Sequence, residues 1–479
     1  MIAFILFACQ QEADTTFWNF KSSPEPGNEP DTAEPADTGV DLLEGYGVGD
    51  PIIYIGTDPE PGSIGMEPAP EWIAAAVIDD NTVVMCGQGG VGTMELQTGE
   101  VISYADSPRG LHIDVSDGTA IVSSRTDQVT YYDVSDPTDI KVGLSLQKHE
   151  VPHEGVAIQG DRSYVAWRSR GLRVYNLEMN LVSVFDASDA SVVDVHNNRA
   201  VLVDGQTLKL LDISNPASIS ELANIELSGP ATDIMMDDAH IAVGLGSRGV
   251  EIFEHDNTAM SRKGQWTFTG AVQGLALDGD HLWLATWTST VVMNIGGEAP
   301  VVLGMERPVN SAFGVAARNG HAVISDWYYS TSYQLIEGVA AAEVYMLGEL
   351  NFQNNVQSNQ WLRVVNGGGR PLEITFEEAV GDYVLNAAGT YTIEPGGSQS
   401  LSVATKDSSG FGDGMIQWSS NDPDDPYGSI FLKPSNQGVG STHPDFEFPI
   451  LSYPDGLTGN FRLSDHIGKV IFLSWWADY

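Results

Sequence analysis

Apolar and polar residues alternate in short runs between residues 71 and 346, and the runs recur in the same order. Each unit has an apolar stretch, a two-residue polar turn, a second apolar stretch, a polar step and a third apolar strand. Alternation with a period of two is typical of β-strands that bury one face. Turn pairs of Asp, Asn or Gly supply the positive backbone angles of tight hairpins. The pattern therefore predicts successive β-hairpins rather than helices.

The turns repeat at a nearly fixed spacing. Their second residues lie 37 to 43 residues apart, at Asn81, Gly118, Asp161, Asn198, Asp238, Asp280 and Gly320. A period near 40 with several strands in each unit predicts a β-propeller. Seven units predict a seven-bladed propeller over residues 50–346, which a strand from the 50–70 region completes.

Two units carry a second signature in their third strand. The stretches YYDVSDPTDIKVGLSL and LKLLDISNPASISELANI place an apolar strand before an Asp-Val-Ser or Asp-Ile-Ser step and a proline. They resemble the LVIVD repeat, a bacterial propeller family, in which the proline turn leads to the outermost strand. The resemblance covers residues 71–346. It implies a scaffold for binding, because that family carries no catalytic motif.

Residues 348–437 lose the period of 40 and show short alternating strands about ten residues apart, which predicts a β-sandwich. Three segments, 365–372, 395–403 and 419–423, resemble in order the motifs of the immunoglobulin-like Hydin or choice-of-anchor-D domain. The resemblance implies a fold and no activity. The whole chain is thus predicted to be all-β, except for the incomplete α/β segment that follows.

Residues 443–479 contain PDF, RLSDH and GK before the apolar run at 470–476. They resemble the start of a thioredoxin-like redoxin of the alkyl hydroperoxide reductase or thiol-disulfide oxidoreductase type, whose central parallel strand is buried on both faces. In that family the motif formed here by Trp475, Trp476 and Ala477 precedes the reactive cysteine at a helix N-terminus, where the thiol pKa is lowered. The resemblance implies that this cysteine follows Tyr479, and that the 479 residues alone are inactive.

The N-terminus predicts a membrane anchor. An apolar run ends in Leu-Phe-Ala-Cys, so residues 1–9 resemble a bacterial lipoprotein signal with Cys9 as the lipidated residue, although no basic residue precedes the run. The run is too short to span a bilayer. Residues 10–49 are rich in Pro, Glu, Asp and Thr, which predicts a disordered acidic tether. The other cysteine, Cys86, lies in the apolar stretch NTVVMCG and is expected to be buried in a strand.

Charge narrows the possible partners. The chain has 65 acidic and 22 basic residues and a formal charge of −43, which repels nucleic acid and anionic lipid. A solvated acidic surface and scattered calcium sites both account for this acidity. Asp422, Asp424 and Asp425 are calcium candidates, although a turn that exposes its carboxylates is the simpler interpretation.

Two further stretches carry candidate chemistry. His149 and His153 flank Glu150 in the loop KHEVPHEG, where they could ligate zinc, contact a small molecule or serve as hydrogen-bonded residues near the channel mouth. The stretch SDWYYSTSY at 325–333 is either the packed aromatic edge of the closing blade or a platform for a sugar.

Two functions remain open from the sequence. The first is an extracytoplasmic lipoprotein, anchored in the outer membrane of a Gram-negative bacterium, whose propeller and sandwich present a thiol-disulfide oxidoreductase or peroxidase module. The second is a non-enzymatic surface binding or adhesion protein. In both, we expect no cofactor, protein partners on the propeller face, membrane attachment through lipid alone, and no nucleic-acid binding.

Overall fold

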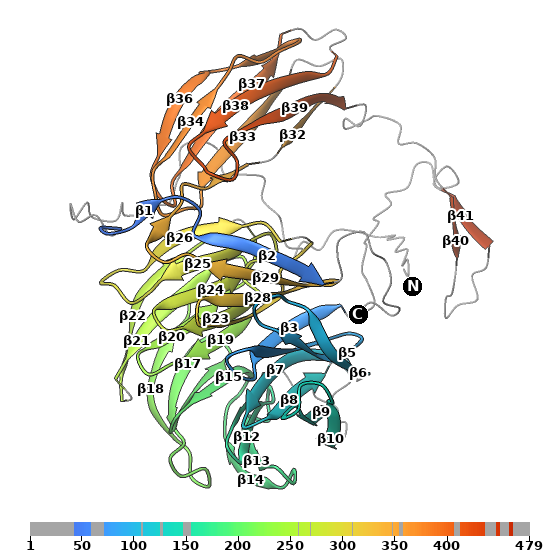
Figure 1. Cartoon of the computed structure of the whole chain (residues 1–479), viewed down its shortest axis with the longest axis vertical. Helices are drawn as coiled ribbons and strands as arrows, with labels where there is room; N and C mark the ends of the chain where they lie inside the picture. Colours follow the sequence, from blue (N-terminus) through green and yellow to red (C-terminus); the bar gives the residue numbers. More distant parts are fainter. Residues whose placement is uncertain are drawn as a thin grey trace, which may run out of the picture.

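The computed structural model describes residues 43–58, 71–106, 109–124, 128–146, 155–256, 258–268, 270–308, 310–346, 348–353, 358–406, 412–435, 447–450 and 459–462. Within these ranges every regular element is a β-strand (Figure 1). For the described residues, the all-β prediction and the predicted repeat of similar β-sheets are therefore confirmed, and each repeating sheet has four strands. No helix within the described ranges is long and apolar enough to cross a membrane.

Tight turns join the first two strands of each repeating sheet, as the polar pairs predict. Asn197 has a φ of 53° and closes the hairpin that pairs His196 with Arg199. Asn319 has a φ of 55° in the corresponding turn before His321. Asparagine tolerates this left-handed conformation because its short side-chain amide can form hydrogen bonds with the nearby backbone.

Seven four-stranded sheets follow one another along residues 52–335. The first contains β3 (Trp72–Val77), β4 (Thr82–Gly87), β5 (Gly90–Glu95) and β6 (Val101–Asp106). The second contains β7 (Gly110–Ser116), β8 (Thr119–Ser124), β9 (Val129–Asp133) and β10 (Lys141–Leu146). The third contains β11 (Val156–Gln159), β12 (Arg162–Ala166), β13 (Leu172–Asn176) and β14 (Leu181–Phe185).

The next sheets repeat this order of antiparallel neighbours. The fourth contains β15 (Ala190–His196), β16 (Arg199–Asp204), β17 (Thr207–Asp212) and β18 (Ser220–Glu226). The fifth contains β19 (Asp233–Met236), β20 (His240–Gly244), β21 (Val250–His255) and β22 (Met260–Trp266). The sixth contains β23 (Gly274–Asp278), β24 (His281–Ala285), β25 (Thr290–Asn294) and β26 (Val301–Glu306). The seventh contains β27 (Gly314–Arg318), β28 (His321–Asp326), β29 (Tyr329–Leu335) and β2 (Ile52–Asp58).

The first strands of the seven sheets pack against one another in a closed cycle, from β3 through β7, β11, β15, β19 and β23 to β27 and back to β3. The cycle closes through a shared apolar cluster in which Trp72, Met85 and Met94 of the first sheet meet Ala316 and Val323 of the seventh. The outermost strand of the seventh sheet comes from the N-terminal side, since β2 pairs antiparallel with β29. This pairing ties the two ends of the ring together.

The second unit consists of two facing sheets. One has the order β31 (Val344–Tyr345), β33 (Asn359–Asn366), β37 (Ser398–Thr405) and β35 (Tyr383–Leu385). The other has the order β32 (Glu349–Gln353), β39 (Tyr427–Ser435), β38 (Gly414–Ser420), β34 (Leu372–Phe376) and β36 (Gly389–Ile393). Their inner faces share one apolar core that includes Phe352, Leu362, Phe376 and Tyr383. We call this unit the sandwich and the seven sheets the ring (Figure 1).

The ring and the sandwich approach each other closely at the glycines 367–369. A Cβ on Gly367 would collide with the side chain of Met305, and one on Gly369 with the carbonyl of Val302. Gly367 N–H donates to the carbonyl of Glu343 at 2.9 Å. Only residues without a side chain allow the sandwich backbone to lie this close to β26.

Two smaller features lie outside these units. The predicted tether boundary at residue 49 is wrong, because Leu43 is buried in the ring core and β1 (Gly47–Val48) pairs in parallel with β30 (Val339–Ala340). Leu43 contributes an apolar side chain to the ring core. In the predicted redoxin segment, β40 (Glu447–Ile450) and β41 (Gly459–Arg462) form an antiparallel pair, and residues 463–479 lie outside the described ranges.

Candidate functional site

The centre of the ring contains two adjoining cavities of about 560 and 230 Å³. Residues of the first strands line both, and the two share His112, Asp233, Met235 and Leu275. The larger cavity forms the mouth of a continuous hollow, and the smaller one extends from it to the other end, where Arg318 lies. The size of the hollow lies in the range of pockets that hold small ligands.

Three residues with left-handed backbone angles surround the mouth. Arg168, Trp287 and Trp327 each follow the second strand of a sheet, with φ values of 40°, 65° and 53°. Each forms an isolated bridge to the beginning of the next sheet, and the fifth sheet has Gly246 at this position. Glycine adopts this angle without strain, whereas a bulky side chain costs energy there. Strained residues of this kind cluster at functional sites.

An aromatic wall forms one side of the mouth. The ring centroids of Trp287 and Phe313 lie 4.9 Å apart, and those of Phe313 and Trp327 lie 4.8 Å apart. Trp287 is 45% exposed, so part of its surface is open to a bound molecule. The two interpretations of the stretch 325–333 therefore apply to different residues. Tyr333 is fully buried, as a packed aromatic edge requires, whereas Trp327 lines the cavity, where a ligand could contact it.

Three aspartates converge on the interior from β7, β15 and β19. Asp114 accepts the backbone N–H of Ile158 at 2.7 Å, Asp194 that of Met236 at 2.6 Å, and Asp233 that of Leu275 at 2.8 Å.

Each donor belongs to the first strand of the following sheet, whose free edge faces the centre of the ring. The carboxylates thus satisfy edge N–H groups that have no strand partner.

The three carboxyls lie deep in the ring yet border the hollow, so each keeps some accessible surface. Burial raises the pKa of Asp114 to about 6 and that of Asp233 to about 7. Burial, followed by the charge of Asp114, raises the pKa of Asp194 well above its ordinary value. Burial lowers the pKa of His112 to about 4, so this imidazole is neutral at pH 7.

The basic side chains that line the hollow are already paired with acids. Arg168 Nη1 lies 3.2 Å from Asp189 Oδ1 at the mouth, and Arg318 Nε donates to Asp80 Oδ1 at 2.7 Å at the other end. The interior therefore carries an excess of negative charge once its carboxyls are ionised. An aromatic wall above several carboxyls can hold a cationic group, because both attract positive charge.

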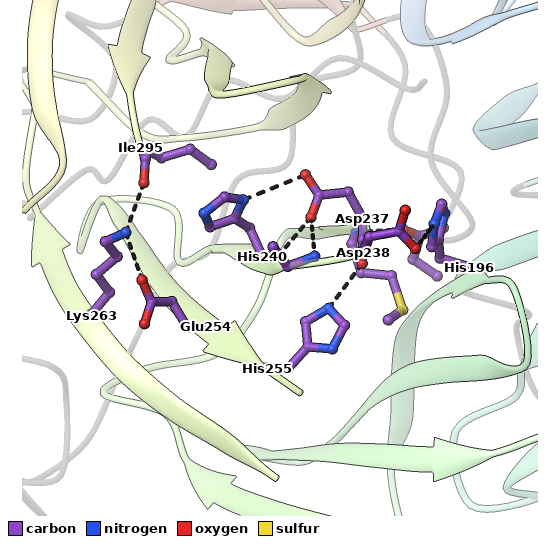
Figure 2. Close-up of polar contacts among 11 residues, drawn as sticks. His196, Asp237, Asp238, His240, Glu254, His255, Lys263 and Ile295 are labelled. Carbon is purple, nitrogen blue, oxygen red and sulfur yellow. Dashed lines mark hydrogen bonds and ion pairs between the residues drawn. The ribbon is translucent and has the colours of Figure 1, made fainter. Parts of the chain in front are cut away.

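Histidines gather elsewhere, around the turn before β20 (Figure 2). His196 Nε2 lies 3.0 Å from Asp238 Oδ1, His255 Nε2 lies 2.8 Å from the carbonyl of Asp237, and His240 Nδ1 lies 3.5 Å from Asp237 Oδ2. These imidazoles each contact a separate oxygen of the turn. Nearby, Lys263 Nζ donates hydrogen bonds to Glu254 Oε1 and to the carbonyl of Ile295. This cluster pins the fourth, fifth and sixth sheets together.

Most of the site residues predicted from the sequence lie outside the described ranges. These are Cys9, His149, His153, Trp475, Trp476 and Ala477. Cys86 is a buried free thiol in β4, as expected, and burial raises its pKa to about 12. A thiol with that pKa is not a nucleophile at neutral pH.

The three calcium candidates lie in the turn between β38 and β39, where the sandwich faces the ring. Asp424 is exposed and Asp425 pairs with Arg307 of the ring, with Nη2 and Oδ2 3.1 Å apart. Asp422 is only 1% exposed, so the simple interpretation of a turn that exposes all its carboxylates is wrong. Its side chain turns inward because its two oxygens accept the backbone N–H groups of Val344 and Asp424.

Sequence analysis missed the interior aspartates. The sequence does contain a pattern that could have identified two of them. An acidic residue interrupts an apolar strand in HIDVS and SVVDVH, at the same distance before the hairpin turn in both. Asp114 and Asp194 occupy the same register, opposite Ile121 and Val201 of the second strand. A buried strand position that keeps a carboxylate indicates a partner for that carboxylate.

No protein family and no characterised protein matches the sequence. The structure is similar to the WD40 domain of Neurospora crassa Pan2, with 11% identity over 61% of this chain and 98% of that one and a TM-score of 0.48. The β-propeller domain of Myceliophteria thermophila Cps50 (Swd1) has 9% identity, covers 56% and 97%, and has a TM-score of 0.46. The computationally designed Ika8 protein has 12% identity, covers 56% and 97%, and has a TM-score of 0.44. The propeller-like repeat itself follows from the sheet order.

Proposed function

We propose that this chain is a binding protein, and that the hollow of the ring holds a small ligand with a cationic group and an apolar body. The observation that carries the proposal is that Asp233 lines the same cavity as Trp287 and Phe313, while Asp114 and Asp194 line the adjoining cavity. An ammonium group over an aromatic face gains about 0.5–2 kcal/mol of binding free energy. Nearby ionised carboxylates attract the ammonium group further. The apolar residues of the mouth cover the rest of the ligand.

Calorimetry tests this proposal with two probes of similar size and opposite charge. Benzyltrimethylammonium should bind the full chain, and p-toluenesulfonate should not, because the lining is acidic. The Trp287→Ala variant should lose most of this binding. The matched control is Trp361→Ala, which removes a tryptophan that is 64% exposed on the sandwich and should bind like the wild type. Equal binding of the two probes, or equal loss in both variants, would overturn the proposal.

We further propose that the ring is a seven-bladed propeller of the LVIVD type and the sandwich an immunoglobulin-like domain of the Hydin type. The order of seven four-stranded sheets and the proline turns after β9 and β17 support the first assignment. The second rests on the three motifs in the sandwich. An experimental structure with fewer than seven sheets around the axis would contradict the first assignment.

The proposed location is the cell envelope, with attachment to the outer membrane through a lipid on Cys9. The apolar run before Cys9 and the acidic stretch after it support this location. Metabolic labelling with a fatty acid tests the attachment. The Cys9→Ala variant should remain an unlabelled precursor, and full labelling of that variant would exclude the anchor.

A second candidate function is the presentation of a thiol-disulfide oxidoreductase or peroxidase module. Its support is the redoxin-like sequence of 443–479, above all Trp475, Trp476 and Ala477. Expression of the natural reading frame to its stop codon should yield insulin reduction or peroxide turnover. This activity should disappear when the first cysteine after Tyr479 becomes serine. A reading frame that encodes no cysteine after Tyr479 would exclude this function and would not affect the proposed binding function.

A further inference from the structure

Five carboxylates from both units meet where the ring faces the sandwich. Asp50 precedes β2 and Glu306 ends β26 in the ring, while Glu343 lies on the link before β31. Asp422 and Asp424 lie in the turn between β38 and β39. They form two groups that share Asp424, one with Asp50 and Glu306 and the other with Glu343 and Asp422. Within each group the ligand oxygens lie within 4.8 Å of one another.

Glu343 is the member that ordinary protein contacts leave unexplained. It is 7% exposed, and its Oε2 has no hydrogen-bond partner in the described part of the chain. This carboxylate points at Asp422 and Asp424 rather than at a basic group. A buried carboxylate without a partner costs several kcal/mol unless it takes up a proton or the protein supplies a counter-charge or a bound ion.

The neighbouring charges increase this cost. Asp422 and Asp424 lie beside Glu343, and Asp50 and Asp424 lie beside Glu306, so like charges repel one another within both groups. Arg307, which follows Glu306, pairs with Asp425, and Asp425 belongs to neither group.

We propose that Glu343, Asp422 and Asp424 bind a calcium ion at the junction of the sandwich and the ring. Calcium binds oxygen ligands at about 2.3–2.6 Å, so two ligands on opposite sides of the ion lie about 5 Å apart. The ligand oxygens lie within 4.8 Å of one another, which is compatible with this geometry. Asp50 and Glu306 supply negative charge from the ring through their shared neighbour Asp424.

The ligand chemistry favours calcium over zinc and magnesium. Both groups consist of carboxylates alone, whereas zinc prefers imidazole and thiolate ligands. Calcium accepts six to eight oxygens in irregular geometry, which suits ligands from a turn and a link. Magnesium demands a near-ideal octahedron and keeps more of its water.

Equilibrium dialysis of the full chain with radioactive calcium tests the site in 150 mM KCl, which suppresses diffuse binding to the acidic surface. The wild type should bind calcium, and excess magnesium should displace it poorly. Asp424→Asn and Glu343→Gln should each weaken binding by about tenfold or more. The matched control is Glu349→Gln, which removes one carboxylate from the same sandwich, where it pairs with Lys433, and should bind as the wild type does.

Thermal unfolding provides a second readout. Calcium should raise the unfolding temperature of the wild type, and chelation should reverse the shift, because the ion binds the folded state alone. The shift should be lost in Asp424→Asn, whose exposed turn position keeps the variant folded. Calcium binding that is absent in the wild type, or equal in all four proteins, would overturn the proposal.

Discussion

The backbone N–H of Met236 on β19 donates to Oδ2 of Asp194 on β15 at 2.6 Å, and this hydrogen bond crosses from one sheet of the ring to the next. The other oxygen of Asp194 accepts the N–H of Val195 at 2.8 Å. One carboxylate therefore satisfies two backbone donors, one of them on the free edge of a neighbouring sheet. The same arrangement joins Asp233 to Leu275 and Asp114 to Ile158.

Asp194→Asn should destabilise the ring. The amide keeps one acceptor oxygen and places an NH₂ group against the second backbone donor, so one buried N–H loses its partner. We expect a loss of about 1–3 kcal/mol in the free energy of unfolding, measured with urea. The control is Asp139→Asn, because the Asp139 side chain is 64% exposed and its partner Lys141 is exposed as well. Equal midpoints for the two variants would show that the interior hydrogen bonds do not stabilise the ring.

The interior carboxyls should make stability fall as the pH rises. Burial raises the pKa of Asp233 from 3.8 to about 7, so the folded state binds this proton more tightly than the unfolded state. The stabilisation is complete below about pH 4 and is lost as the pH rises to about 7. His112 contributes in the opposite direction, because its pKa falls from 6.5 to about 4 on folding.

Comparison of the wild type with Asp233→Asn isolates the carboxyl, since both proteins keep His112. The free energy of unfolding should be measured with urea at pH 5 and at pH 8. Its decrease from pH 5 to pH 8 should be larger in the wild type than in the variant. An identical pH dependence in the two proteins would mean that Asp233 titrates at its ordinary pKa in the folded state.

Trp287→Gly should separate stability from binding. Glycine removes the strain of the 65° φ angle, as Gly246 does at the matching position, but it also removes the packing against Phe313. These effects oppose each other, so stability should change by no more than about 1 kcal/mol. Calorimetry should show that cation binding is lost. A variant that binds as well as the wild type would assign Trp287 to packing alone.

The thiol of Cys86 should react only when the protein unfolds. It is fully buried in β4, and its pKa of about 12 leaves almost no thiolate at neutral pH. In a Cys9→Ala background, a disulfide reagent should release no coloured product from the native chain and one equivalent in denaturant. Rapid reaction of the native chain would show that β4 opens or that the thiol is accessible.

Much of the ring follows from local sequence signals. Asn197 and Asn319 mark hairpins because few residues tolerate a positive φ angle, and the strands on either side alternate because one face is buried. The pairing of β2 with β29 needs only an unpaired strand at each end of the ring. Such features depend on neighbouring residues, so the sequence carries them directly.

The hollow and the junction could not be predicted in the same way. Asp194 meets Met236 across 42 positions of the chain, and Asp422 meets Val344 across 78. Neither pair shares a local motif, because the contact exists only after separate sheets have packed. Likewise, the lack of a hydrogen-bond partner for Glu343 Oε2 becomes apparent only in the folded structure, where this atom is buried.

The most direct test of the binding function compares choline with 3,3-dimethylbutan-1-ol, which has nearly the same shape and no charge. Their affinities for the full chain should be measured by calorimetry at pH 8, where the interior carboxyls carry the most charge. Choline should bind about tenfold more tightly, and the preference should vanish in Trp287→Gly. Equal affinities, or tighter binding of the alcohol, would contradict the assignment of the hollow as a cation site.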